Sequence, residues 1–182
     1  MASPTRAQLL ASVDRTLRDV IAPGLAVLFC GINPGLYSAY TGHHFARPGN
    51  RFWPTLHAAG FTPRVYAPAE ERELLKLGLG ITNVVPRASA RADELAPDEL
   101  VAGGRRLAAK VRRHRPRALA VLGIGAYRAA FARPDARLGP QPDRIGETLV
   151  WVLPNPSGLN AHYSGKELAR VFREMREAVM GE

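Results

Sequence analysis

The chain has 182 residues, enough for one domain with a sizeable core, and its single cysteine, Cys30, excludes an internal disulfide and a cysteine-based zinc site. It contains no run of about 18 apolar residues, and charges interrupt its N-terminal region, so we expect neither membrane span nor signal peptide and predict a cytoplasmic protein. A net charge of +9, from 25 basic and 16 acidic residues, favours nucleic acid as partner, although a GC-rich genome would also enrich arginine.

The first fifty residues predict a helix, a strand and a long loop. Apolar residues recur with helical spacing from Thr5 to Val20, which predicts an N-terminal helical extension over residues 1–20. Leu25–Cys30 is apolar throughout and bounded by Pro-Gly, as expected of a short buried strand. Residues 31–50 contain four glycines and two prolines, which indicates a long structured loop.

The rest of the chain alternates helices with short strands. Further helices are predicted over Asn50–Ala59, Pro68–Leu77, Pro97–His114, Gly123–Phe131 and Ser164–Met180. Further strands are predicted over Ile81–Val85, Arg117–Leu122 and Thr148–Leu153, with a loop over 132–146. This alternation predicts an α/β fold, a three-layer α/β/α sandwich with a central, mainly parallel, short-stranded sheet. We expect a single domain over residues 1–182.

Functional sites of such sheets gather at the carboxyl ends of the strands. Gly31-Ile-Asn-Pro-Gly35 follows the first strand, where glycine permits close backbone approach and Pro34 fixes a turn that aims Asn33 outward. An asparagine amide can orient a water molecule without deprotonating it strongly; an Asx turn is the alternative interpretation. Neither glycine-rich nucleotide-binding pattern is present, so a nucleotide cradle is not expected.

A second motif, Pro154-Asn-Pro-Ser-Gly-Leu159, follows the last strand. Ser157, Gly158 and Asn160 offer backbone groups that could grip a phosphate or a base edge. Leu159 is a large apolar residue in a polar loop. It is either a wedge that enters a base stack or a leucine that folds back onto the core.

Together these residues resemble the bacterial mismatch-specific uracil–DNA glycosylases, in the thymine/uracil mismatch branch of the uracil–DNA glycosylase superfamily. The resemblance covers about Ile21 to Ala178, with the motifs in the same order and with similar spacing. The motifs that carry it are Gly31-Ile-Asn-Pro-Gly-Leu36, Thr41-Gly42, Phe45-Ala46, Asn50-Arg-Phe-Trp53, Ala59-Gly-Phe61 and Trp151-Val-Leu-Pro-Asn-Pro-Ser-Gly-Leu159.

The resemblance implies a uracil–DNA glycosylase-like fold and a monofunctional enzyme that needs no metal or cofactor. Such an enzyme flips a mispaired uracil, chiefly from G·U, and hydrolyses its N-glycosidic bond, leaving an abasic site for base-excision repair. Ethenocytosine and thymine are further candidate substrates. The implied partner is double-stranded DNA with mismatched or damaged bases, bound by a monomer.

The resemblance also implies roles for individual residues. Asn33 would position the hydrolytic water. Substrate-binding residues would be Gly31, Ile32, Ser38, Phe45 and Asn155. DNA-binding residues would be Ser157, Gly158, Leu159, Asn160 and Ala161. Ala161 stands where relatives often carry an arginine, so His162 or Tyr163 could complete the wedge instead.

Other polar and aromatic residues leave alternatives open. Asp93 ends the segment Arg87-Ala-Ser-Ala-Arg-Ala-Asp93, which the resemblance places near the active site. It could activate water or stabilise the sugar cation as a second catalytic residue, or it could be a capping or solvated carboxylate. Tyr37 and Tyr40 could narrow the pocket or pack on the loop. His43 and His44 are adjacent, which rarely allows both to bind one metal, so no zinc site is expected.

Two other classes of function remain as rivals. A DNA-binding module on the same scaffold could sense lesions without cutting, although the complete Gly31–Gly35 turn with Asn33 argues for catalysis. A small-molecule α/β hydrolase would need a G-x-S-x-G elbow, which the chain lacks.

Overall fold

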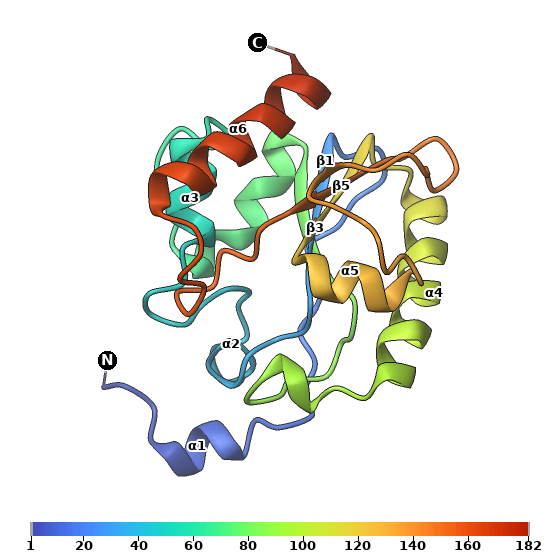
Figure 1. The fold of residues 1–182 in the computed structure, drawn as a ribbon. Coiled ribbons are helices and arrows are strands. Elements are labelled where there is room, and N and C mark those ends of the chain that lie inside the picture. The colour runs from blue at the N-terminus through green and yellow to red at the C-terminus, as the bar shows by residue number, and fades with distance from the viewer. Residues whose placement is uncertain (1, 182) are drawn as a thin grey trace.

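A sheet of five strands forms the centre of the computed structural model, which describes residues 2–181 (Figure 1). The strands are β1 Val27–Gly31, β2 Leu79–Asn83, β3 Ala118–Leu122, β4 Gly139–Pro140 and β5 Leu149–Leu153. Their order is β2-β1-β3-β5-β4, and all neighbours are parallel except β4, which runs antiparallel to β5. The prediction of a central, mainly parallel, short-stranded sheet is confirmed. The short β4 lies within the predicted 132–146 loop.

Helices cover both faces of this sheet. The larger ones are α3 Phe52–Ala58, α4 Pro97–His114, α5 Ile124–Ala130 and α6 Gly165–Met180. In β1, Val27 and Phe29 pack in a core with α3 and α6, whereas Leu28 and Cys30 pack in a second core with α4 and α5. Figure 1 shows these helix pairs on opposite sides of the sheet. This period-two alternation confirms the three-layer sandwich.

Local signals explain where several helices begin and end. The predicted bounds of α4 agree at both ends, because Pro97 occupies its first turn and basic residues occupy its last turn. The Ser164 hydroxyl caps α6 by accepting from the Glu167 N–H at 3.2 Å. The predicted Pro68–Leu77 helix has its expected bounds but 3₁₀ geometry, as η1. No helix within residues 2–181 combines the length and apolar character needed to cross a bilayer.

The predicted N-terminal helix is wrong beyond Leu10, since α1 covers only Arg6–Leu10. After it, the Asp14 N–H donates to the Ala88 carbonyl oxygen, and Val20 exchanges two backbone hydrogen bonds with Ile81 in β2. Val20 is fully buried there. Pairing with distant backbone therefore outweighs the local helical spacing: residues 11–14 form turns, and residues 14–20 pair with β2 and the segment after it rather than extending the helix.

Two short helices also lie outside the helices that the sequence predicts. The 31–50 loop contains α2, Leu36–Thr41, which ends where Gly42 adopts a φ of 79°. The segment between β2 and α4 contains η2, a 3₁₀ turn over Ala92–Glu94. Met1 and Glu182, the ends of the expected 1–182 domain, lie outside the described residues.

Candidate active site

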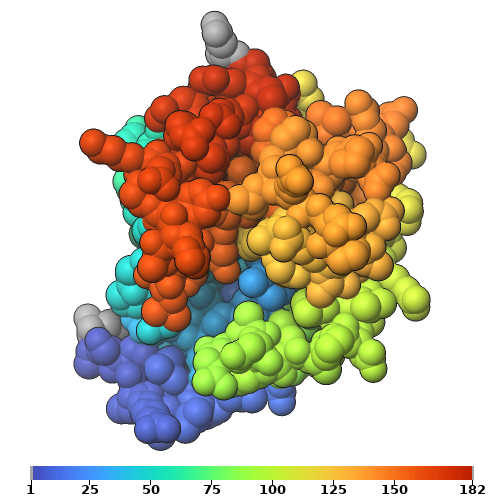
Figure 2. Space-filling model, in the orientation of Figure 1, coloured from blue at the N-terminus to red at the C-terminus, as the bar shows by residue number. Residues whose placement is uncertain are grey.

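A pocket of about 410 Å³ opens at the carboxyl edge of the parallel strands. Its walls come from the turn after β1, the segment after β2 and the loop after β5. Figure 2 shows this face hollowed between the green segment that follows β2 and the orange-red loop that follows β5. The predicted residues that line it are Gly31, Ile32, Asn33, Ser38, Phe45, Asp93, Asn155, Ser157 and Leu159. Both sequence motifs therefore meet at one site.

A larger hollow of about 650 Å³ lies at the opposite, amino edge of the strands. It is lined by residues such as Arg115, Arg117 and Arg144, and neither motif reaches it. The candidate active site is therefore the smaller pocket.

Gly31 leaves room in the pocket that any other residue would fill. A Cβ at this position would lie 2.7 Å from Asn83 Oδ1 and 3.3 Å from the Phe45 ring. Asn83 ends β2 directly beside Gly31, and its amide nitrogen lies 3.4 Å from His44 Nδ1. His44 Nε2 lies 2.9 Å from the Arg18 carbonyl oxygen, so a neutral ring carries its proton there and leaves Nδ1 as an acceptor. The Asn83 amide is thereby oriented with its oxygen toward Gly31.

The aromatic wall of the pocket is Phe45, whose φ of 52° is unusual for a bulky side chain. Its ring stacks on Phe52 at 4.1 Å between centroids. The Ser38 hydroxyl accepts a hydrogen bond from the Ala46 N–H at 3.1 Å, which ties this loop to α2. Ser38 thus lines the pocket and also holds the backbone next to Phe45. Backbone strain of this kind persists only where the surroundings enforce it, as they often do at functional sites.

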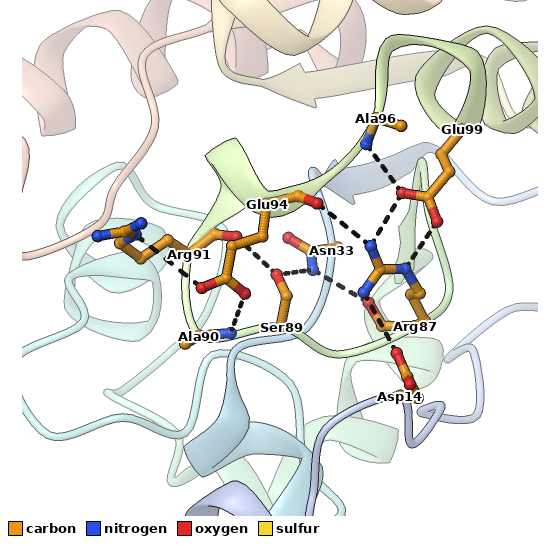
Figure 3. A network of polar contacts seen from close by, with 9 residues as sticks. All are labelled: Asp14, Asn33, Arg87, Ser89, Ala90, Arg91, Glu94, Ala96 and Glu99. Carbon is orange, nitrogen blue, oxygen red and sulfur yellow. Dashed lines mark hydrogen bonds and ion pairs between the residues drawn. The ribbon is translucent and has the colours of Figure 1, made fainter.

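The Asn33 amide has one orientation that its surroundings allow (Figure 3). Its Nδ2 donates to the Arg87 carbonyl oxygen at 3.0 Å and to Ser89 Oγ at 2.8 Å. A carbonyl oxygen can only accept, and the Ser89 hydroxyl donates its own proton to the Arg91 carbonyl oxygen at 2.7 Å. No donor within residues 2–181 reaches Asn33 Oδ1. This oxygen is therefore free to accept from a molecule in the pocket.

The loop after β5 presents Leu159 to solvent. The Asn160 N–H donates to the Ser157 carbonyl oxygen at 3.0 Å, which closes a turn around Leu159, and Leu159 is 77% exposed. The alternative of a leucine folded onto the core is therefore wrong. The Arg51 guanidinium holds the loop by donating to the carbonyl oxygens of Ser157, Asn160 and Tyr163 at 3.0, 2.8 and 2.6 Å.

The other predicted DNA-binding residues lie on the same loop but outside the pocket. Gly158 packs so closely on the preceding loop that a Cβ would lie 2.6 Å from the Gly49 carbonyl oxygen. Asn155 Oδ1 accepts from the Ser157 N–H at 2.9 Å, so Asn155 shapes the loop as well as lining the pocket. The Asn160 side chain folds back onto the Asn155 carbonyl oxygen at 3.0 Å, whereas Ala161 is exposed.

At the rim of the pocket, Asp93 forms an ion pair with Arg91 at 3.1 Å, and its side chain is 73% exposed. This exposure favours the solvated alternative over a general base. Arg47 and Arg91 also line the pocket, and Arg47, which has no ion-pair partner within residues 2–181, gives it positive charge. Tyr37 and Tyr40 are not among the lining residues, which favours packing on the loop over narrowing of the pocket.

Within residues 2–181, no three His, Cys, Asp or Glu side chains gather closely enough to hold a metal ion. The adjacent histidines instead contact one buried carboxylate. His43 Nδ1 lies 3.4 Å from Glu71 Oε1, and the His44 N–H donates to Glu71 Oε2 at 2.8 Å. These contacts secure the loop that carries Phe45.

Six polar lining residues are not among the site residues predicted from the sequence: His44, Arg47, Asn50, Asn83, Ser89 and Arg91. Asn83 has a detectable signal, because it ends a strand at the edge where the two motifs lie. Ser89 lies in the 87–93 segment that the resemblance places near the active site, but the sequence does not indicate its contact with Asn33, which lies 56 residues away along the chain.

Comparisons with known proteins identify a family and a similar fold. Residues 18–178 match the family model described as the uracil DNA glycosylase superfamily. The fold is similar to a solution NMR structure of a Methanosarcina acetivorans protein that is described as a candidate uracil DNA glycosylase. The TM-score is 0.57 at 22% sequence identity, over 90% of this chain and 99% of that chain. At this identity the structural likeness supports the fold.

Proposed function

Because the chain belongs to the uracil DNA glycosylase superfamily, we propose that it excises mispaired uracil from double-stranded DNA by hydrolysing the N-glycosidic bond. The preferred substrate is G·U, with ethenocytosine and thymine as further candidates. The product is an abasic site for base-excision repair, and the enzyme acts as a monomer without a cofactor.

The observation that carries this proposal is the fixed Asn33 amide. With its nitrogen held by Arg87 and Ser89, its Oδ1 is available to accept a hydrogen bond from a water molecule in the pocket. A neutral amide is a weak base, which suits a reaction in which bond cleavage comes first. The C1′–N1 electron pair leaves with the base as a uracil anion, the water oxygen then bonds to the oxocarbenium-like C1′, and its extra proton passes to solvent.

The pocket also carries groups suited to reading uracil. The Asn83 Oδ1 that lies beside Gly31 is an acceptor for the N3–H of uracil. Cytosine has an unprotonated N3 at that position, so two acceptors would face each other and cytosine would be disfavoured. The Phe45 ring offers an aromatic face on which a flipped base can stack.

A base stacked in a duplex cannot reach this pocket, so it must be extruded first. Leu159 stands exposed at the tip of a turn that Arg51 secures, beside the pocket mouth. It is an apolar side chain suited to fill the gap that an extruded base leaves. A mispaired base costs less to unstack than a paired one, which favours G·U over A·U.

A panel of end-labelled oligonucleotides tests the proposal. Each carries one target: G·U, A·U, G·T, G·ethenocytosine or single-stranded uracil. Abasic sites are detected by alkaline strand cleavage after incubation at one stated salt concentration. The proposal predicts fastest excision from G·U, with an unchanged rate in EDTA. Tight binding to every duplex without any abasic product would instead support the lesion-sensing module.

A further inference from the structure

The turn that carries Asn33 is paired along its length with the segment after β2. The N–H groups of Val84, Val85 and Ser89 donate to the carbonyl oxygens of Gly31, Ile32 and Pro34, at 2.9, 2.9 and 3.1 Å. The Arg87 carbonyl oxygen then accepts from Asn33 Nδ2. The position of the 84–89 segment thus sets the orientation of the Asn33 amide.

The Arg87 side chain fixes this segment by hydrogen bonds to residues from three other parts of the chain (Figure 3). Its Nε and Nη2 donate to the two carboxylate oxygens of Glu99, in the first turn of α4, at 2.7 and 3.0 Å. Nη1 donates to Asp14 Oδ1 at 3.2 Å, and Nη2 also reaches the Glu94 carbonyl oxygen at 3.3 Å. Such a two-pronged arginine–carboxylate contact has far better defined geometry than a single surface ion pair.

The N-terminal segment also forms backbone hydrogen bonds next to Arg87. The Asp14 N–H donates to the Ala88 carbonyl oxygen at 3.0 Å, and the Ala88 N–H donates to the Arg15 carbonyl oxygen at 2.8 Å. Asp14 has a φ of 66°, so the chain bends there to bring both its backbone and its carboxylate to residues 87–88. This segment precedes residue 18, where the match to the family model begins.

We propose that Arg87, clamped by Asp14 from the N-terminal segment and by Glu99 from α4, is a positioning residue for the catalytic amide of Asn33. This inference rests on the proposed function, in which Asn33 Oδ1 holds the attacking water. Displacing a catalytic group by about 1 Å can cost on the order of 10²-fold in rate. A shift of the Arg87 carbonyl oxygen would move the Asn33 amide that it orients, and it would lower the excision rate even if Arg87 never contacts DNA. The N-terminal segment is thereby part of the catalytic apparatus.

The first test needs no substrate. In ¹⁵N-labelled protein, the two side-chain N–H signals of Asn33 report the hydrogen bonds of Nδ2. Arg87→Lys and Asp14→Asn should move these signals toward the positions of a solvent-exposed amide. Asp143→Asn is the matched control, because it removes another exposed ion pair, with Arg133 at 2.8 Å, away from the pocket. Unchanged Asn33 signals in both cluster variants would overturn the proposal.

The second test is a double-mutant cycle in single-turnover excision of uracil from G·U, with enzyme in excess. Arg87→Lys should lower the rate about tenfold in the native background, because the Asn33 amide is displaced rather than removed. In an Asn33→Ala background the same change should have almost no effect, since the group that it positions is gone. Equal losses in both backgrounds would assign Arg87 to folding or DNA binding and overturn the proposal.

Thermal unfolding identifies any variant that fails to fold. If Arg87→Lys does so, Asp14→Asn and Glu99→Gln, which each remove part of the clamp, take its place in the cycle. The two proposals fail separately. Absence of uracil excision by the native protein would contradict the proposed function, whereas the signals of the Asn33 amide would still confirm or overturn the clamp.

Discussion

Asn83 and Gly31 end neighbouring parallel strands, and Asn83 Oδ1 lies 2.7 Å from where a Cβ at position 31 would stand. Gly31→Ala should therefore displace the Asn83 amide and the Phe45 ring, which both line the pocket. We expect uracil excision to fall at least about tenfold while binding to undamaged DNA is retained, since a small misplacement of binding groups has effects of this size. Single-turnover rates and a DNA-binding titration measure both.

Gly125→Ala is the matched control, because a Cβ at that position would meet no atom within 4 Å outside its chain neighbours and the backbone of its own helix. It should leave excision unchanged. If Gly31→Ala excises uracil as fast as Gly125→Ala, Asn83 and Phe45 do not shape the base site.

Leu159→Ala should lower excision from G·U about tenfold, because the apolar contact that it removes contributes about 1–3 kcal/mol to the flipped state. Uracil in single-stranded DNA needs no extrusion from a stack and should be affected less. Leu138→Ala, at an exposed leucine outside the pocket, is the control. Equal losses for paired and single-stranded uracil would show that Leu159 does not fill the gap left by an extruded base.

DNA binding should weaken steeply with salt, with a log–log slope of roughly −0.9 for each phosphate neutralised. Arg47→Gln, at the pocket mouth, should reduce that slope by about one contact without changing the preference among bases. Arg170→Gln, in an ion pair on α6, should leave it unchanged. Fluorescence anisotropy at several salt concentrations measures the slopes. A slope near zero for the native protein would contradict the electrostatic interface.

The Arg87–Glu99 contact predicts a pH dependence of stability. Its hydrogen bonds lower the pKa of Glu99 below the ordinary value of 4.5. A carboxylate with a lowered folded-state pKa stabilises the native protein above its unfolded-state pKa, and this contribution is lost as the pH falls through the folded-state value. The free energy of unfolding should therefore differ between native protein and Glu99→Gln at neutral pH, and the difference should shrink below pH 4.5. A difference that grows on acidification would contradict this assignment.

Much of the fold follows from signals that act over a few residues. Pro97 at the start of α4 and Ser164 before α6 mark helix ends in the sequence as they do in the structure. The N-terminal helix fails as a prediction because residues 14–20 form backbone pairs with Ile81 and Ala88, far along the chain. Helical spacing carries no information about such partners.

In the candidate site, too, the sequence predicts some residues but not the contacts between distant segments. Asn33 and Leu159 can be placed from the sequence, because each follows a predicted strand at the same edge of the sheet. The support of Asn33 cannot, because Ser89 and Arg87 reach it only once β1 and β2 pair in register and the following segments run side by side. The sequence therefore predicts the catalytic Asn33 amide, whereas its orientation depends on contacts that form only in the folded protein.

Single-turnover excision of uracil from a G·U duplex by Asn33→Ala tests the central claim most directly, with Asp93→Asn measured beside it. Loss of one positioned polar group typically costs on the order of 10²-fold or more in rate, so Asn33→Ala should lose most excision while its thermal unfolding and DNA binding stay close to native. Asp93→Asn should change little, since its carboxylate is 73% exposed and paired with Arg91. A folded Asn33→Ala protein that excises uracil at a near-native rate would contradict the account, and a large loss in Asp93→Asn would then move the catalytic role to that carboxylate.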